Sequence, residues 1–113
     1  MVAFNFNNVR MTVVKTAKTG VVNKETVFTF QQADNIVSAE YEGGGVVKGY
    51  LVGKLTGEEL QFRYCQLGSA EDLDGGLSNC IVSTTPDGRL RIIERFQWES
   101  RGDAGENIFE EIA

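Results

Sequence analysis

The sequence predicts a single all-β domain, a small antiparallel up-and-down β-barrel of about eight strands. Short runs of β-branched and aromatic residues recur roughly every ten to twelve residues, with turn signals between them. No window of helical length carries its apolar residues at a 3.6-residue period. Thirteen glycines against one proline are typical of a chain with many tight turns. Since 113 residues are enough for one core but not for two, residues 1–113 are expected to form one domain.

Eight segments carry the strand pattern, although Ile108 and Phe109 in the last one are also compatible with a helical turn. Before the first strand, Val2, Phe4 and Phe6 alternate with other residues, so the N-terminus is expected to add a short strand or to plug one end. The predicted strands span Arg10–Thr16, Thr26–Gln31, Ile36–Tyr41, Val46–Leu55, Glu59–Gln66, Leu77–Thr84, Arg89–Trp98 and Glu106–Ile112.

Turn residues and hydrophobic alternation select the same registers at the predicted hairpins. A three-residue glycine loop, Gly43–Gly45, sets Tyr41 and Val47 on one face and supplies the left-handed position that such a loop needs. A two-residue Gly57-Glu58 turn aligns bulky residues and places a glycine under an aromatic ring. It pairs Leu55 with Leu60, Gly53 with Phe62 and Leu51 with Tyr64.

The third predicted hairpin turns at Asp87-Gly88, a strong signature of a two-residue type I′ turn. This register pairs Thr85 with Leu90, Ser83 with Ile92, Ile81 with Glu94 and Asn79 with Phe96. Since no amphipathic helix is available to cover the resulting dry face, the sheet is expected to close on itself. The opposite face is predicted to be wet, with Lys48, Lys54, Gln61, Arg63, Arg91, Arg95 and Gln97.

A family resemblance is carried by Thr26-Val27-Phe28, Ile36-Val37 with Tyr41 and its glycines, Val46-Val47-Lys48-Gly49, Phe62-Arg63-Tyr64 and Glu94-Arg95-Phe96-Gln97-Trp98. Over about residues 10–112 the chain resembles short, mostly bacterial proteins that often bear the inherited label N-acetylglutamate synthase. The resemblance implies a calycin-like barrel, similar to lipocalins and avidins. It does not imply acetyltransferase activity, because the sequence lacks the Gln/Arg-x-x-Gly-x-Gly/Ala loop that grips acetyl-CoA. The biotin contacts of avidins do not map onto this sequence, so biotin is not predicted.

Composition narrows the classes of function. A net charge of -5 disfavours nucleic acids and anionic membranes as partners, and the absence of a signal peptide or long apolar run favours a cytoplasmic location. In that compartment Cys65 and Cys80 are expected to be reduced thiols. The absence of histidine excludes serine-histidine triads, cysteine-histidine dyads and histidine-ligated metals, so we expect no metal site and no cofactor.

Glu94 is the most informative polar residue, because alternation directs it inward among apolar neighbours, where an unpaired carboxylate is costly. Three interpretations stay open: an internal hydrogen-bond network or a position near the barrel mouth, a contact to a small ligand in the lumen, and a general base. The candidate ligand-binding residues are Glu94, Tyr64, Trp98, Phe96, Asn79 and Tyr41, and no catalytic residue is assigned.

The leading hypothesis is a non-enzymatic barrel that binds a small, partly apolar molecule in its lumen. The alternative is a structural or interaction protein with a filled lumen that self-associates into a homo-oligomer. A weak carboxylate-based enzyme is the third hypothesis.

Overall fold

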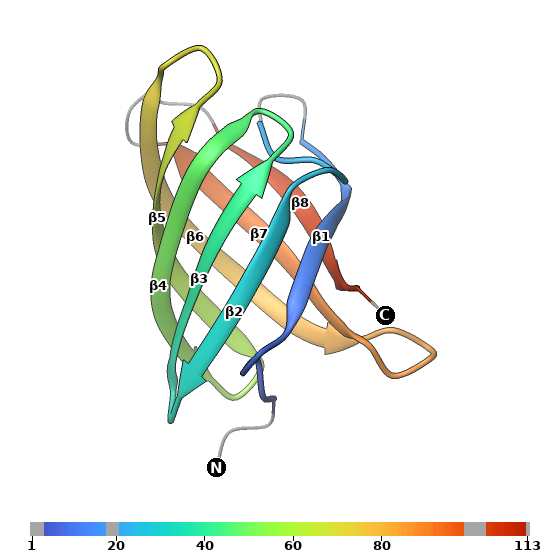
Figure 1. The fold of residues 1–113 in the computed structure, drawn as a ribbon. Helices are drawn as coiled ribbons and strands as arrows, with labels where there is room; N and C mark the ends of the chain where they lie inside the picture. Colours follow the sequence, from blue (N-terminus) through green and yellow to red (C-terminus); the bar gives the residue numbers. More distant parts are fainter. Residues whose placement is uncertain (1–3, 18–20, 99–103, 113) are drawn as a thin grey trace.

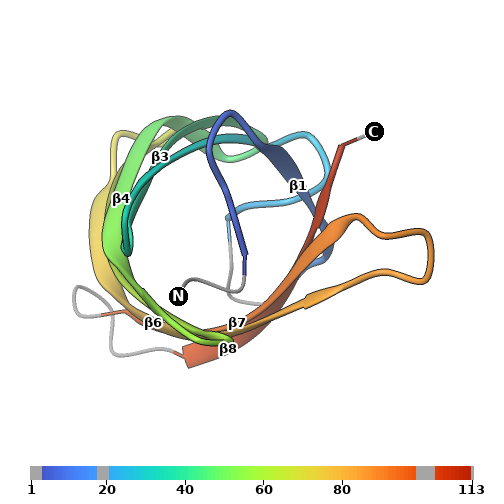
Figure 2. The ribbon, with the colours of Figure 1, turned by 90° about the horizontal axis from the view of Figure 1, so that it is seen from below.

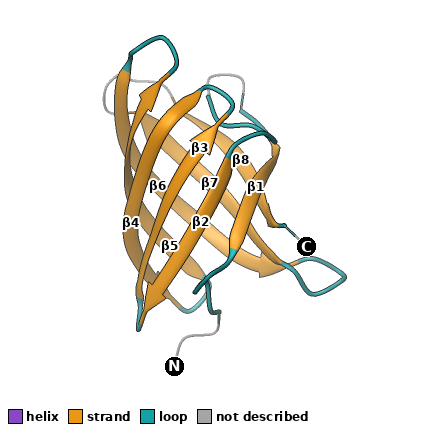
Figure 3. Ribbon diagram, viewed as in Figure 1, coloured by secondary structure: helices purple, strands orange, loops and turns teal. Residues whose placement is uncertain are grey.

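The computed structural model describes residues 4–17, 21–98 and 104–112, and all regular structure within them is β-strand (Figures 1 and 3). Each strand pairs antiparallel with the next, and β1 pairs with β8, so the sheet closes into a barrel (Figure 2). The predicted fold class is therefore confirmed. The strands are β1 (Arg10–Lys15), β2 (Val27–Ala33), β3 (Ile36–Gly43), β4 (Val46–Thr56), β5 (Glu59–Gly68), β6 (Leu73–Thr84), β7 (Leu90–Trp98) and β8 (Ala104–Glu111).

The predicted strand ends agree with the structure to within two residues, except at the start of β6. The pair Gly75-Gly76 precedes the predicted strand but lies inside β6, where Gly76 is opposite Tyr64. A Cβ at Gly76 would come 2.6 Å from the Tyr64 hydroxyl oxygen. Gly76 thus makes room for a large ring within a strand.

Alternate side chains point into the barrel and out to solvent, as the predicted dry and wet faces require. The β4–β5 register is confirmed at all of its predicted pairs. Of the apolar positions on β7, Ile92 and Phe96 are buried and Leu90 is partly buried against the core. The hydrophobic core therefore lies in the lumen of the barrel.

The predicted β6–β7 register is wrong by one residue. Thr84, not Thr85, pairs with Leu90, because the loop holds three residues and Thr85 donates its amide to the Arg89 carbonyl at 2.8 Å. Gly88 takes a left-handed conformation, with φ 87°, at the end of this loop. A one-residue shift exchanges the two faces of β6, so Asn79 points outward.

The glycine turn between β3 and β4 also differs from the prediction. Gly43 pairs with Val46, which leaves Gly44 and Gly45 as the turn, and irregular pairing follows on both neighbouring ladders. Val46 is consequently buried, whereas Val47 is 53% exposed. Tyr41 is buried as expected, opposite Gly49.

The N-terminal segment plugs the lower end of the barrel in Figure 1, one of the two predicted outcomes. Phe6 is fully buried with its ring centroid 5.3 Å from that of Phe30. Two backbone hydrogen bonds hold the segment: the Asn8 amide donates to the Phe30 carbonyl, and the Phe30 amide donates to the Val9 carbonyl. Val2 lies outside the described residues.

Candidate functional site

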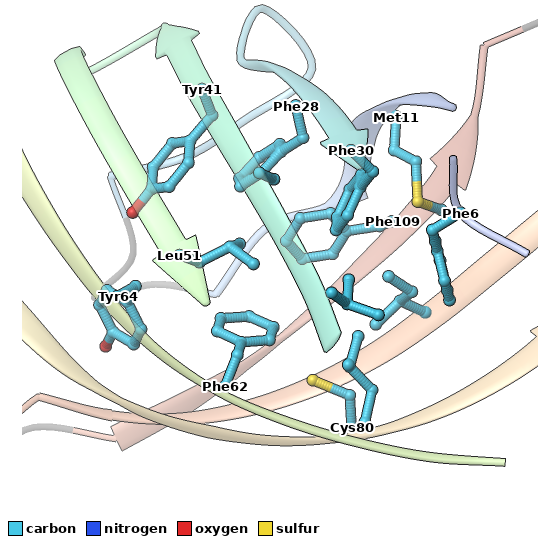
Figure 4. Packing of buried hydrophobic residues seen from close by; sticks show 14 of the residues in the cluster. Phe6, Met11, Phe28, Phe30, Tyr41, Leu51, Phe62, Tyr64, Cys80 and Phe109 are labelled. Carbon is cyan, nitrogen blue, oxygen red and sulfur yellow. The ribbon is translucent and has the colours of Figure 1, made fainter. Parts of the chain in front are cut away.

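A small cavity lies in the half of the lumen away from the N-terminal plug. Figure 4 shows the hydroxyl groups of Tyr41 and Tyr64 on the side of the lumen away from Phe6. The cavity volume is about 20 Å³, room for about one water molecule. Its lining residues are Val21, Val22, Phe28, Tyr41, Leu51, Phe62, Tyr64, Gln66, Glu94, Phe96, Asn107 and Phe109.

Glu94 faces this cavity and is held by neutral donors from two neighbouring strands. The Ser78 hydroxyl donates to Oε2 at 2.6 Å, and the Asn107 side-chain amide donates to Oε1 at 3.0 Å. Asn107 in turn accepts the backbone amide of Ala17 at 2.9 Å. The internal hydrogen-bond network expected as one interpretation of Glu94 is present, with Ser78 in place of the predicted Asn79 because of the register shift.

Burial raises the pKa of the Glu94 carboxyl, and the hydrogen bonds from Ser78 and Asn107 oppose this shift by stabilising the charged form. Cys80 lies opposite Glu94 on β6, and burial, followed by the charge of Glu94, raises the pKa of its thiol well above the ordinary value. The interior therefore resists the introduction of negative charge at both positions.

Tyr41 and Gln66 form a second polar pair in the cavity wall. The Tyr41 hydroxyl donates to Oε1 of Gln66 at 2.8 Å, and both side chains are buried. Burial, followed by the Coulomb effect of Glu94, raises the pKa of Tyr41. Nε2 of Gln66 has no hydrogen-bond partner among the described residues.

Glycines position three of the aromatic rings that line the cavity. Tyr41 pairs with Gly49, Tyr64 with Gly76 and Phe96 with Gly105 across neighbouring strands. A Cβ at Gly49 would lie 2.4 Å from the Tyr41 ring, and one at Gly105 would lie 2.7 Å from the Phe96 ring. Each ring therefore packs directly against a glycine of the neighbouring strand, and any larger residue there would displace the ring.

Four of the six predicted site residues come together at the cavity: Glu94, Tyr64, Phe96 and Tyr41. Asn79 does not, since it is exposed on the outer surface, where it accepts the Gln61 amide at 3.0 Å. Trp98 ends β7 opposite Gly76, but its side chain lies outside the described residues.

Three polar residues at this site were missed from the sequence: Ser78, Asn107 and Gln66. Gln66 follows Phe62 and Tyr64 at alternate positions of β5, so continuing that alternation would have placed it inside. Ser78 and Asn107 required knowledge of the β6–β7 and β7–β8 registers.

The described residues contain no cluster of three or more histidine, cysteine or acidic side chains that could hold a metal ion. Cys65 and Cys80 are both free thiols, the first exposed and the second buried. No helix among the described residues is long and apolar enough to cross a membrane.

Comparison with known proteins gives one result for this chain. The sequence model of a family described as "Avidin-like protein" matches residues 4–112. Searches of curated proteins and of solved structures found no significant match. The family match covers the barrel from the plug to the last strand.

Proposed function

The chain thus belongs to the avidin-like protein family, and from this premise we propose that it binds a small, partly apolar molecule in the half of the lumen that holds Glu94. Family membership supports a ligand-binding barrel. The lining supports the partly apolar character of the ligand, because nine of its twelve side chains are aliphatic or aromatic. The residues proposed to contact the ligand are Tyr41, Tyr64, Gln66, Glu94, Phe96 and Asn107.

The observation that carries the proposal is the amide of Gln66. Its side chain is only 4% exposed, yet Nε2 has no hydrogen-bond partner among the described residues. A buried donor without an acceptor costs about 1–3 kcal/mol, and such groups are rare in native proteins. A ligand with an acceptor at this position would recover that cost.

Access to the site requires the segment at Val21 and Val22 to move, because a cavity of about 20 Å³ is too small for an organic molecule. Both valines line the cavity, and Val22 is 8% exposed. Val21 accepts a backbone hydrogen bond from Gly45 at 3.1 Å.

The test is a small-molecule screen by ligand-induced change in Tm, followed by calorimetry on two matched variants. Gln66→Leu removes the inward amide, and Gln61→Leu makes the same change at an exposed position of the same strand. We expect ligands that stabilise the wild type and Gln61→Leu to bind Gln66→Leu roughly tenfold more weakly. Equal affinity of all three proteins for every ligand would place binding elsewhere.

The exposed face of β4, β5 and β6 favours a second candidate function, self-association of a barrel with a filled lumen. Large apolar side chains lie on this face, and four of them are more than half exposed. Sedimentation velocity over a range of concentrations tests it, and a monomer at 100 μM, roughly the upper range for a specific dimer, contradicts it. The residues are Val47, Tyr50, Val52, Leu67 and Leu73.

A further inference from the structure

The cavity lining contains an acidic side chain but no basic one among the described residues. Among the described lining residues, Glu94 is the only carboxyl group, and none is lysine or arginine. An anion entering this site would lose its hydration and meet a buried acidic group with no compensating cation. The lining is therefore unfavourable to anions.

The hydrogen bonds of Glu94 supply no counter-charge. Ser78 and Asn107 are neutral donors, one to each carboxylate oxygen. Neutral donors satisfy the geometry of a carboxylate but leave its net charge uncompensated in a buried setting. A positively charged ligand group close to Glu94 would supply the counter-charge that the lining residues do not provide.

The aromatic residues add a second attraction for positive charge. Six rings line the cavity, and the face of an aromatic ring carries the negative part of its quadrupole. Contacts between organic cations and ring faces contribute about 0.5–2 kcal/mol, more when water is excluded. The rings are those of Phe28, Tyr41, Phe62, Tyr64, Phe96 and Phe109.

Tyr41 links the surroundings of Glu94 to the side-chain amide of Gln66, whose Nε2 has no acceptor among the described residues. Its hydroxyl donates to Gln66 at 2.8 Å, and Tyr41, Gln66 and Glu94 line the same cavity. A ligand that spans the two positions would present positive charge to Glu94 and an oxygen acceptor to Nε2 of Gln66.

We propose that the lumen selects small organic cations, an ammonium group carried near a hydrogen-bond-accepting oxygen, over neutral and anionic molecules of the same size. This inference rests on the proposed function and adds the chemical class of the ligand. Glu94 recognises the charge, the aromatic rings enclose it, and Gln66 recognises the oxygen.

Three probes of matched shape test the selectivity: 2-phenoxyethylamine, 2-phenoxyethanol and phenoxyacetate. All three carry a phenyl ring and an ether oxygen, and at pH 7.5 their charges are positive, neutral and negative. We expect calorimetry to show the amine binding the wild type roughly tenfold more tightly than the alcohol, and phenoxyacetate binding most weakly.

Two variants assign the selectivity to residues. Glu94→Gln keeps the shape of the side chain and should abolish the preference for the amine over the alcohol. Gln66→Leu should weaken the amine and the alcohol by a similar factor and leave that preference intact. Glu59→Gln, at an exposed position, controls for the loss of one negative charge from the protein.

The outcomes separate the inference from the proposed function. If the alcohol or phenoxyacetate binds as tightly as the amine, or if the preference survives in Glu94→Gln, the charge selectivity is wrong and the ligand-binding proposal stands. If none of the probes binds at millimolar concentration although the screen yields ligands that Gln66→Leu weakens, the charge selectivity is wrong. If the screen yields no such ligand either, the proposed function itself is contradicted. Should Glu94→Gln fail to fold, the order of the wild-type affinities still decides the matter.

Discussion

The two halves of the lumen differ in what fills them. The plugged half, defined here by Phe6, Met11, Phe30, Val82 and Ile92, is apolar, and each of these side chains is at most 1% exposed. The polar half is the cavity described above, where carboxyl, amide and phenol groups lie among aromatic rings. Figure 4 shows its two phenols, those of Tyr41 and Tyr64. Close packing of apolar groups stabilises the first, whereas buried polar groups make the second costly unless each is hydrogen-bonded.

The difference indicates that the plugged half mainly stabilises the barrel, whereas the polar half contains the proposed binding site. Residues of one strand serve both halves, since β7 contributes Ile92 to the plugged half and Glu94 to the polar half. Substitutions in the plugged half and in the polar half should therefore change stability by different amounts and for different reasons.

The largest effect is expected in the plugged half, from Phe6→Ala. Deleting a fully buried ring that packs on Phe30 should lower the free energy of unfolding by about 3–5 kcal/mol. Urea denaturation measures it, with Tyr50→Ala on the outer surface as the control, expected to change stability by about 0.5 kcal/mol or less. A loss as small as that of the control would mean that the N-terminal segment is not part of the core.

The next largest effect is expected beside the polar half, from Gly76→Ala. The added Cβ would lie 2.0 Å from the Gln97 carbonyl oxygen, and this backbone cannot yield as a flexible side chain would. We expect a loss of about 1–3 kcal/mol in unfolding free energy and a displaced Tyr64 ring. In Gly68→Ala, the matched control, the nearest atom is 3.5 Å away, and near-equal stability of the two variants would refute the packing argument.

A smaller effect is expected from Tyr41→Phe, which deletes the hydroxyl that donates to Gln66. Loss of this buried hydrogen bond should cost about 1 kcal/mol in unfolding free energy. Tyr50→Phe, an exposed counterpart, should be neutral. Equal melting temperatures of the two variants would indicate that the Tyr41–Gln66 pair contributes nothing to stability.

The fold was predictable because alternation is clear on most strands. On β5, Leu60, Phe62 and Tyr64 alternate with charged or polar residues, and only one register buries all three. The same alternation placed Tyr41 and Glu94 inside. Closure of the sheet followed from the absence of any helix to cover its dry face.

The β6–β7 register was not predictable, because the two faces of β6 have similar mixtures of polar and apolar residues. Its inward residues and its outward residues each contain polar and apolar side chains, so neither register buries more hydrophobic surface by inspection. A turn ending in Asp-Gly also suits two loop lengths. The inward set is Ser78, Cys80 and Val82, and the outward set is Asn79 and Ile81.

The last effect depends on pH and is expected at Glu94, where hydrogen bonds from Ser78 and Asn107 offset part of the cost of burying the carboxylate. Its folded-state pKa is raised above the ordinary value of 4.5, so the folded protein binds a proton more tightly than the unfolded chain does. That contribution is fully present below about pH 4.5 and is lost as pH rises through the folded pKa. Relative to Glu94→Gln, which does not titrate, the wild type should therefore lose stability across this window.

Unfolding free energies of wild type and Glu94→Gln, measured from pH 4 to pH 8, test this prediction. Among the described residues, the titratable Tyr41 and Tyr64 line the cavity with Glu94, and Cys80 lies opposite Glu94 on β6. Burial raises the pKa values of Tyr41 and Cys80, so these two groups stay neutral over this range. Glu59→Gln, at an exposed position, controls for net charge. A difference between wild type and Glu94→Gln that is flat with pH, or that moves in favour of the wild type as pH rises, would show that the carboxylate is already compensated in the empty barrel. The polar half would then have no unmet charge to offer a cation.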